Sequence, residues 1–252
     1  DKPRTAIWAG MGMGKTSSTL TALETMYLAG ESRPTLVLAP LRVCNSTWPE
    51  EAHKWAHLTE IDVQPVTGDE KNRLAALKRD VSIYACNYQN IPWLVDHYGA
   101  HWPFGTVVAD ESTRLKSFRL RQGGVRAQAL AKVAHKNVKR FINLTGTPAP
   151  NGLQDLWGQT WFLDAGQRLG RTYSAFTDRW FCRTADGFGR ELRSQSAADE
   201  IYNKLRDICL TIEARDWFDL NEPIVKEIEV EMPRSARRLY DQLKKDLILQ
   251  IE

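Results

Sequence analysis

The sequence has 252 residues, of which 42% are hydrophobic and 26% are charged, and its formal net charge is +3. A chain of this length can bury a full core and form one large domain, or a domain with an insertion. No apolar run approaches the roughly 18 residues of a membrane-spanning helix. The four cysteines (Cys44, Cys86, Cys182 and Cys209) form no C-x-x-C pair, so we expect reduced thiols and neither disulfides nor a zinc site.

Short apolar segments alternate with amphipathic ones over the first 145 residues. TLVLA (35–39) is apolar throughout, as in strands buried on both faces of a sheet. Near Thr47, a Thr-x-x-Glu pattern with Glu50 predicts a capping box at a helix start. This alternation indicates a parallel, doubly wound α/β sheet. The expected strands are 5–8, 35–39, 61–66, 82–86, 106–110 and 141–145, and the expected helices are 15–28, one from about Thr47, and 69–78.

The composition and the predicted secondary structure of the sequence change after Asn151. Residues 151–222 are rich in aromatics and predicted to be mostly helical, with a loop at 187–196. IVKEIEVEM (224–232) alternates like a strand, and Pro233 starts an amphipathic helix. We therefore expect three parts. They are an α/β lobe (1–157), a mostly helical insertion (158–222), and a strand and helix (223–252) that return to the lobe or lead to a further one.

A glycine-rich loop follows the first predicted strand. A strand, closely spaced glycines and Lys-Thr at a helix start is the arrangement that wraps backbone N–H groups around phosphates. Lys15 would reach the β- and γ-phosphates, and the Thr16 hydroxyl would bind Mg²⁺. The strict pattern has Gly where this chain has Ala9, and a glycine-rich turn with an incidental lysine is the alternative. The loop residues are Gly10, Met11, Gly12, Met13, Gly14, Lys15, Thr16 and Ser17.

Polar residues also follow two later predicted strands. Asp110 and Glu111 end an apolar strand, where two carboxylates are costly unless they meet a cation. Asp110 would hold Mg²⁺ and Glu111 would deprotonate an attacking water; a helix N-cap with an acidic first turn is the alternative. In LTGTPAPN (144–151), Thr145, Gly146 and Thr147 form either a tight turn or a relay that senses the nucleotide. Because ligands of such sheets bind at the carboxyl ends of strands, we expect these segments to converge.

Five collinear segments resemble the motifs of superfamily-two helicases and translocases, most closely the Swi/Snf-like ATPases with their phage and bacterial relatives. In order they match motif I, motif Ia, the segment before motif II, the DEAH box and motif III. Motif I of this branch commonly lacks the first Gly, so Ala9 fits, whereas Ser112 and Thr113 stand where the DEAH box has Ala-His. The segments are GMGKT (12–16), TLVLAPLRVCNSTWPEEAHKW (35–55), ACNYQNI (85–91), DESTRLKS (110–117) and LTGTPAPNGLQDLW (144–157).

The resemblance implies a three-layer RecA-like lobe of the P-loop NTPase class, with a mostly parallel sheet and a helical insertion after motif III. It also implies ATP and Mg²⁺ as cofactors and DNA, usually a duplex bound without regard to sequence, as a partner. The family hydrolyses ATP between two lobes, and the second lobe, with its arginine fingers, would follow Glu252. An isolated first lobe is expected to be nearly inactive. We expect it in the cytoplasm, or in the nucleoid or host cytoplasm if a phage encodes it, without a secretion signal.

Positive charge is concentrated in one stretch. No Asp or Glu occurs between Ser112 and Gln154, which contains nine Lys and Arg residues. A one-signed stretch of this length indicates a polyanion partner, and a solvated helix face is the alternative. Arginines and aromatics also mix in residues 168–193, where packed aromatics and solvated arginines are the favoured interpretation. By the resemblance, the expected nucleic-acid contacts are Arg42, Asn87, Arg114, Lys116, Arg119, Arg121 and Arg126.

Two other functions remain open at this point. One is a non-catalytic nucleic-acid-binding or interaction module on a retained motor fold; the presence of Lys15, Thr16, Asp110 and Glu111 speaks against it. The other is a different enzyme with a phosphate-binding loop, such as a kinase, which would lack the Thr-Gly-Thr-Pro segment.

Overall fold

The computed structural model of the protein describes residues 2–58, 61–185, 187, 189–213 and 226–249. The chain divides into two units, Asp1–Phe218 and Asp219–Glu252. The first unit carries the sheet and most helices, and the second contains α9 (Arg234–Leu249), which begins directly after Pro233 as predicted. The predicted boundary at residues 222–223 lies outside the described residues. No helix in the described part of the chain has the length and apolarity needed to cross a bilayer.

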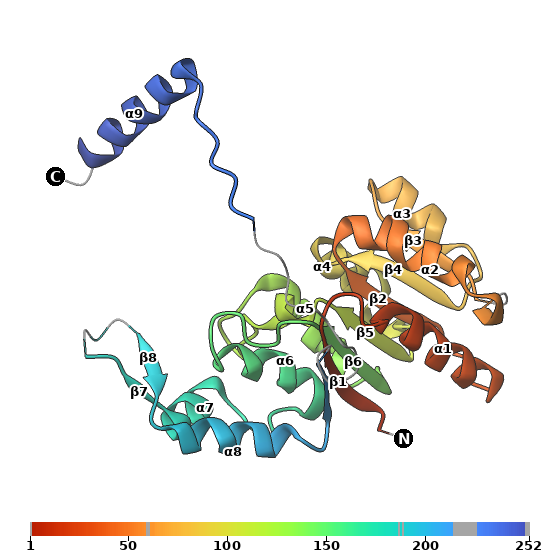
Figure 1. Cartoon of the computed structure of the whole chain (residues 1–252). Helices are drawn as coiled ribbons and strands as arrows, with labels where there is room; N and C mark the ends of the chain where they lie inside the picture. The colour runs from red at the N-terminus through yellow and green to blue at the C-terminus, as the bar shows by residue number, and fades with distance from the viewer. Residues whose placement is uncertain (1, 59–60, 186, 188, 214–225, 250–252) are drawn as a thin grey trace. The chain divides into compact units, whose positions relative to one another are not determined.

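A seven-stranded parallel sheet forms the centre of the first unit (Figure 1), with strand order β3-β4-β2-β5-β6-β1-β9. The α/β prediction is therefore confirmed. All neighbouring pairs in this sheet are parallel, so the carboxyl ends of its strands meet at one edge. The strands are β1 (Arg4–Ala9), β2 (Thr35–Ala39), β3 (Val63–Val66), β4 (Ile83–Asn87), β5 (Thr106–Asp110), β6 (Arg140–Thr145) and β9 (Cys209–Ile212).

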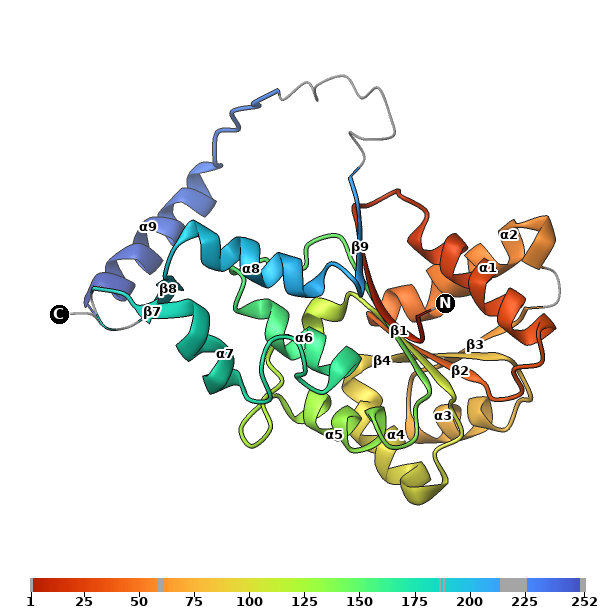
Figure 2. The same ribbon diagram turned by 90° about the horizontal axis from the view of Figure 1, so that it is seen from below.

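Helices cover both faces of this sheet. Figure 2 shows α1 and α2 on one side and α3, α4 and α5 on the other. Along β2, Val37 and Ala39 join the core beneath α1 and α2, whereas Leu36 and Leu38 join the larger core on the opposite face. Burial on both faces explains why this strand is apolar throughout. The helices of the first unit are α1 (Lys15–Leu28), α2 (Trp48–Lys54), α3 (Glu70–Leu77), α4 (Ile91–Tyr98), α5 (Val125–Ala134), α6 (Asp155–Asp164), α7 (Tyr173–Trp180) and α8 (Gln195–Leu205).

The helix predicted to begin near Thr47 begins earlier. The chain is helical from residue 41, and a π-helix, η1 (Val43–Thr47), leads directly into α2. Thr47 has helical backbone angles and no capping hydrogen bond, so the predicted capping box is wrong. Cys44 and Trp48, one helical turn apart, are both fully buried. Their shared apolar face extends the helix backwards and outweighs the local capping preference of Thr47.

Three short strands were not predicted. β7 (Phe181–Arg183) pairs antiparallel with β8 (Arg190–Leu192), so the predicted loop at 187–196 is partly strand, and α8 starts within it. β9 lies in the segment predicted to be mostly helical, yet it pairs with β1 in the main sheet. Strands of three or four residues are too short for their periodicity to be recognised.

The strand predicted at residues 224–232 is wrong where it is described. Residues 226–232 are exposed and have no regular secondary structure, and residues 224–225 lie outside the described part. The alternating apolar side chains that suggested a strand, Ile228 and Val230, lie in solvent. A strand pattern produces a strand only where a neighbouring strand is present to accept its backbone hydrogen bonds.

Candidate functional site

The glycine-rich loop connects β1 to α1. Gly12 and Gly14 have φ angles of 76° and 69°, in the left-handed region that glycine adopts without strain. Gly14 is the N-cap of α1, so the unpaired amides of the first helical turn border the loop. Ala9 is the last residue of β1 and only 2% exposed. The position at which the strict pattern has its first glycine is therefore a buried strand position, and it accommodates the methyl group of Ala9.

Lys15 folds back over this loop. Its Nζ donates hydrogen bonds to the carbonyl oxygens of Ala9, at 2.7 Å, and Gly10, at 2.9 Å. The ammonium group is thus held at the mouth of the loop by neutral acceptors. An anionic phosphate oxygen is a stronger acceptor for an ammonium donor than a carbonyl. The loop can therefore exchange these internal bonds for bonds to a phosphate.

Asp110 ends β5 with its carboxylate largely buried, at 8% exposure. Its Oδ2 accepts a hydrogen bond from Trp48 Nε1 at 2.9 Å, and its backbone carbonyl accepts one from the Tyr88 hydroxyl at 2.9 Å. Burial raises the pKa of Asp110, while the Trp48 hydrogen bond and the charge of Lys15 act in the opposite direction. Both β5 and β1 pair in parallel with β6, so the acid pair and the glycine-rich loop lie at the same edge of the sheet on either side of that strand.

Glu111 has an unusual backbone conformation. Its φ of 58° and ψ of 55° lie in the left-handed region. Among the described residues, the only other non-glycine residue with a positive φ is Ala165, at 55°. Such a conformation costs of order 1–3 kcal/mol in a non-glycine residue and occurs most often at functional sites. Glu111 precedes the 3₁₀-helix η5 (Ser112–Leu115) but makes no side-chain capping bond. The alternative of a capping role for this carboxylate is therefore not supported.

The Thr-Gly-Thr segment after β6 packs against the glycine-rich loop. The hydroxyl of Thr145 accepts a hydrogen bond from the Thr147 amide at 3.1 Å, which closes a tight turn. A methyl group added at Gly146 would lie 3.3 Å from the Ala9 carbonyl oxygen and 3.5 Å from Gly10 Cα. The turn and the relay, which the sequence left as alternatives, are therefore compatible, because the turn touches the loop.

Gln159 of α6 connects the acid pair to this turn. Its Oε1 accepts a hydrogen bond from the Ser112 hydroxyl at 2.8 Å, and its Nε2 donates one to the Pro148 carbonyl at 2.7 Å. Sequence reasoning missed Gln159, as it missed the roles of Trp48 and Tyr88. A polar amide inside an otherwise apolar helical stretch was the one available signal for Gln159.

Four of the seven residues expected to contact nucleic acid are engaged within the protein. Asn87 is buried and hydrogen-bonds to Gln89 and Asn90. The other three are Lys116, in an ion pair with Asp155 at 3.0 Å, Arg114, 5.8 Å from the Tyr88 ring centre, and Arg119, 3.4 Å from that of Tyr173. Arg119 also donates to the carbonyls of Lys116 and Phe118.

The other three, Arg42, Arg121 and Arg126, are exposed, and within the described residues no ion pair holds them. Their guanidinium groups are therefore available to a polyanion. In the region after α6, Arg179 is paired with Glu200 at 2.9 Å, and Arg168 and Arg190 are also in ion pairs, whereas Arg171 and Arg183 are exposed. Phe176 and Trp180 are buried. The packed aromatics agree with the favoured interpretation of that region, whereas its expectation of solvated arginines holds only in part, because three of them are in ion pairs.

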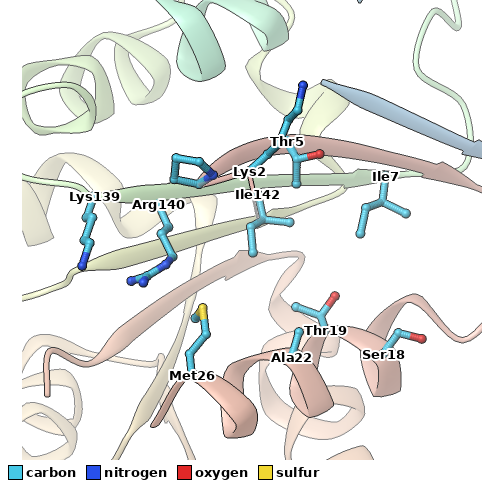
Figure 3. A pocket seen from close by; sticks show the side chains of 11 residues that line it. Lys2, Thr5, Ile7, Ser18, Thr19, Ala22, Met26, Lys139, Arg140 and Ile142 are labelled. Atoms are coloured by element: carbon cyan, nitrogen blue, oxygen red, sulfur yellow. The ribbon is translucent and has the colours of Figure 1, made fainter. Parts of the chain in front are cut away.

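Two of the cavities that border β1 in the described part of the chain bear on the candidate site. One, of about 500 Å³, lies between α1 and the sheet, where Thr5, Ile7 and Ile142 point toward Ala22 and Met26 (Figure 3). It extends to Lys139 and Arg140 at the amino end of β6, away from the acid pair. The other, of about 600 Å³, is bordered by Gly10, Gly146 and Pro148. Since ligands of parallel sheets bind at the carboxyl edge, the second cavity is the one that belongs to the candidate site.

A parallel sheet that gathers a glycine-rich loop, an acid pair and a Thr-Gly-Thr turn at its carboxyl edge defines a RecA-like α/β lobe. The chain belongs to the SNF2-related domain family, whose model matches residues 7–252. Its fold is similar to that of the SWI2/SNF2 ATPase core of Sulfolobus solfataricus, solved in complex with double-stranded DNA. That likeness has a TM-score of 0.63 and 24% identity, and covers 83% of this chain and 40% of that one.

Curated relatives agree with this assignment. The chain is 57% identical to protein p41 of Acyrthosiphon pisum secondary endosymbiont phage 1 over its whole length, which corresponds to 56% of that protein. It is 26% identical to the helicase SWR1 of Yarrowia lipolytica, over 88% of this chain and 12% of the relative. It is 25% identical to an ATP-dependent helicase, MG018, of Mycoplasma genitalium, over 96% of this chain and 22% of the relative. The chain thus spans about half or less of the relatives it matches.

Proposed function

We propose that this chain is the first motor lobe of an ATP-dependent DNA translocase or helicase. The observation that carries the proposal is that the glycine-rich loop after β1 and the acid pair at the end of β5 lie at the same edge of the sheet, on either side of β6. The glycine-rich loop would hold the phosphates of ATP through its backbone amides and Lys15. Glu111 would orient and deprotonate the attacking water.

The side chains at this edge fit a magnesium ion. Among the described residues Asp110 makes no ion pair, although its carboxylate is buried, and a buried charge without a partner is costly. Mg²⁺ is typically bound by one or two protein oxygens together with substrate phosphates. Asp110 and the Thr16 hydroxyl would hold it here. When bound, the ion would neutralise charge on the phosphates.

The exposed arginines Arg42, Arg121 and Arg126 are the best-supported candidates for contacts to nucleic acid. Exposed guanidinium groups bind phosphates without reading sequence, which a moving motor requires. The solved structure with double-stranded DNA contains a protein of the same fold, and we infer a DNA duplex as the partner here. Binding should weaken steeply with salt and be indifferent to sequence.

Hydrolysis by this lobe alone should be close to background. In the motor family a second lobe completes the site with an arginine finger, a contribution worth roughly 10³- to 10⁵-fold in rate. A longer chain with both lobes should show ATP hydrolysis that DNA stimulates. Rapid hydrolysis by these 252 residues would contradict a site shared between lobes.

Binding of a fluorescent ATP analogue in the presence of Mg²⁺ tests the nucleotide site directly. Removing a charged donor to phosphate costs about 1.5–3 kcal/mol, so Lys15→Ala should weaken affinity by about 10- to 100-fold. Glu111→Gln should leave binding nearly unchanged but abolish DNA-stimulated hydrolysis in the longer chain. If Lys15→Ala changed neither the affinity for the ATP analogue nor the DNA-stimulated hydrolysis, the alternative of a non-catalytic module on a retained motor fold would be favoured.

A further inference from the structure

Trp48 is fixed in the core beside the candidate site. Its side chain is fully buried among the residues that pack beneath α1 and α2, including Leu20, Val37 and Val108. An indole has one donor and no acceptor, and its only polar atom, Nε1, points out of this cluster to the Asp110 carboxylate at 2.9 Å. A rigid aromatic ring thus presents a single hydrogen-bond donor to the acidic residue at the end of β5.

Asp110 is held at two points. Trp48 contacts one carboxylate oxygen, and the buried Tyr88 hydroxyl donates to the backbone carbonyl of the same residue. These donors come from elements on opposite faces of the sheet, since Trp48 belongs to the core under α2 and Tyr88 to the core under α4. The backbone and the side chain of Asp110 are therefore positioned independently.

The backbone immediately before Trp48 forms the π-helix η1. This five-residue segment precedes Trp48 directly, and a π-turn takes up one more residue than an α-turn. Such a bulge rotates all following side chains relative to those before it. Here Cys44 lies inside the π-helix and Trp48 directly follows it, and both are fully buried in the same core. Single π-turns of this kind occur frequently at functional sites.

We propose that Trp48 is a positioning residue for magnesium–nucleotide binding: its indole N–H fixes the rotamer of Asp110 so that the carboxylate is preset for the ion. This inference rests on the proposed function. A purely structural role would require that Trp48 contributes packing alone. The two roles differ in what the N–H group does, because packing depends on the shape of the ring and positioning depends on its donor.

The test measures how strongly Mg²⁺ promotes binding of a fluorescent ATP analogue to the 252-residue chain. Trp48→Phe removes the donor and part of the ring. A second variant keeps the shape by placing benzothienylalanine at position 48, in which sulfur replaces the N–H group. Trp55→Phe is the matched control, since Trp55 is 40% exposed and its Nε1 donates at 2.9 Å to Glu51, away from Asp110. Thermal unfolding of each variant reports packing separately.

Outer partners of metal ligands typically contribute 10- to 100-fold to metal affinity. The benzothienylalanine variant should therefore need at least about tenfold more Mg²⁺ for half-maximal nucleotide binding, with little change in melting temperature, while Trp55→Phe should match the wild type. If the isosteric variant kept the wild-type Mg²⁺ dependence, the positioning role would be overturned and the proposed function would stand. If the wild-type chain bound no nucleotide at any Mg²⁺ concentration, the proposed function itself would fail, and the inference with it.

Discussion

Gly158 lies where α6 crosses the segment that follows the acid pair. A Cβ atom built at this position would lie 2.6 Å from the Lys116 carbonyl oxygen and 2.7 Å from that of Leu115. Both atoms belong to the backbone and cannot move aside as the end of a flexible side chain could. We therefore predict that Gly158→Ala destabilises the protein.

Two contributions of opposite sign determine how Gly158→Ala changes the free energy of unfolding: helix propensity and overpacking. Inside a helix, Ala is favoured over Gly by about 1 kcal/mol, so propensity alone would stabilise the variant. Overpacking against fixed atoms costs up to about 3 kcal/mol. The net loss is then up to about 2 kcal/mol, which in a chain of this size lowers the melting temperature by up to about 8 °C.

Thermal unfolding followed by circular dichroism measures this change. Asn203→Ala, at an exposed position inside α8, is the control for helix propensity and should be neutral or slightly stabilising. A Gly158→Ala variant that melts at or above the wild-type temperature would refute the close approach of α6 to residues 115–116.

Two further predictions concern charged residues outside the nucleotide site. Because Arg119 stacks on Tyr173, Arg119→Ala should lower the melting temperature, whereas Arg126→Ala should leave stability intact and weaken DNA binding at low salt; equal losses of DNA affinity for both variants would contradict this division. Hydrogen bonds from Arg168 lower the pKa of Asp207 to about 2, so its stabilising effect is present above the unfolded value of 3.8 and is lost as pH falls toward 2. Asp207→Asn should therefore lower the melting temperature by a few degrees at most at pH 7, since this pair is largely exposed, and the difference should shrink below pH 4, whereas a pH-independent difference would exclude the ion pair as its cause.

The central strands β2, β4 and β5 could be predicted from sequence because each is buried along its whole length, on both faces of the sheet. The predicted ranges of β2 and β5 agree with the structure, and α1 begins and ends as expected. Prediction failed where long-range contacts decide the local structure. β9 exists because β1 offers it an open edge, and the helix around Thr47 is extended because Cys44 and Trp48 share one core. Neither cause can be recognised from a short segment of the sequence, because both depend on contacts formed in the folded chain.

The same distinction applies to the candidate site. Its three segments could be predicted to converge, because the carboxyl ends of parallel strands share one edge. The side chains that link them could not. Trp48 and Asp110 are 62 residues apart in sequence, and Ser112 and Gln159 are 47 apart. Local patterns say nothing about such pairs, because their geometry depends on how η1 and α6 pack on the sheet. The division of the chain at residue 157 stays a prediction.

Unfavourable features gather at one edge of an otherwise well-packed sheet. Asp110 keeps a buried carboxylate whose pKa is raised by burial, and Glu111 has a strained backbone. One strand away, the Oδ1 atom of the buried Asn143 has no hydrogen-bond partner among the described residues. Each feature lowers stability, and a sequence selected for stability alone would have replaced them. Because the core beneath β2, β4 and β5 is fully buried, the protein can tolerate these losses at its edge. A carboxylate that is held buried without an ion pair is already desolvated, so under the proposed function a cation arriving with phosphates would meet a site with little left to reorganise.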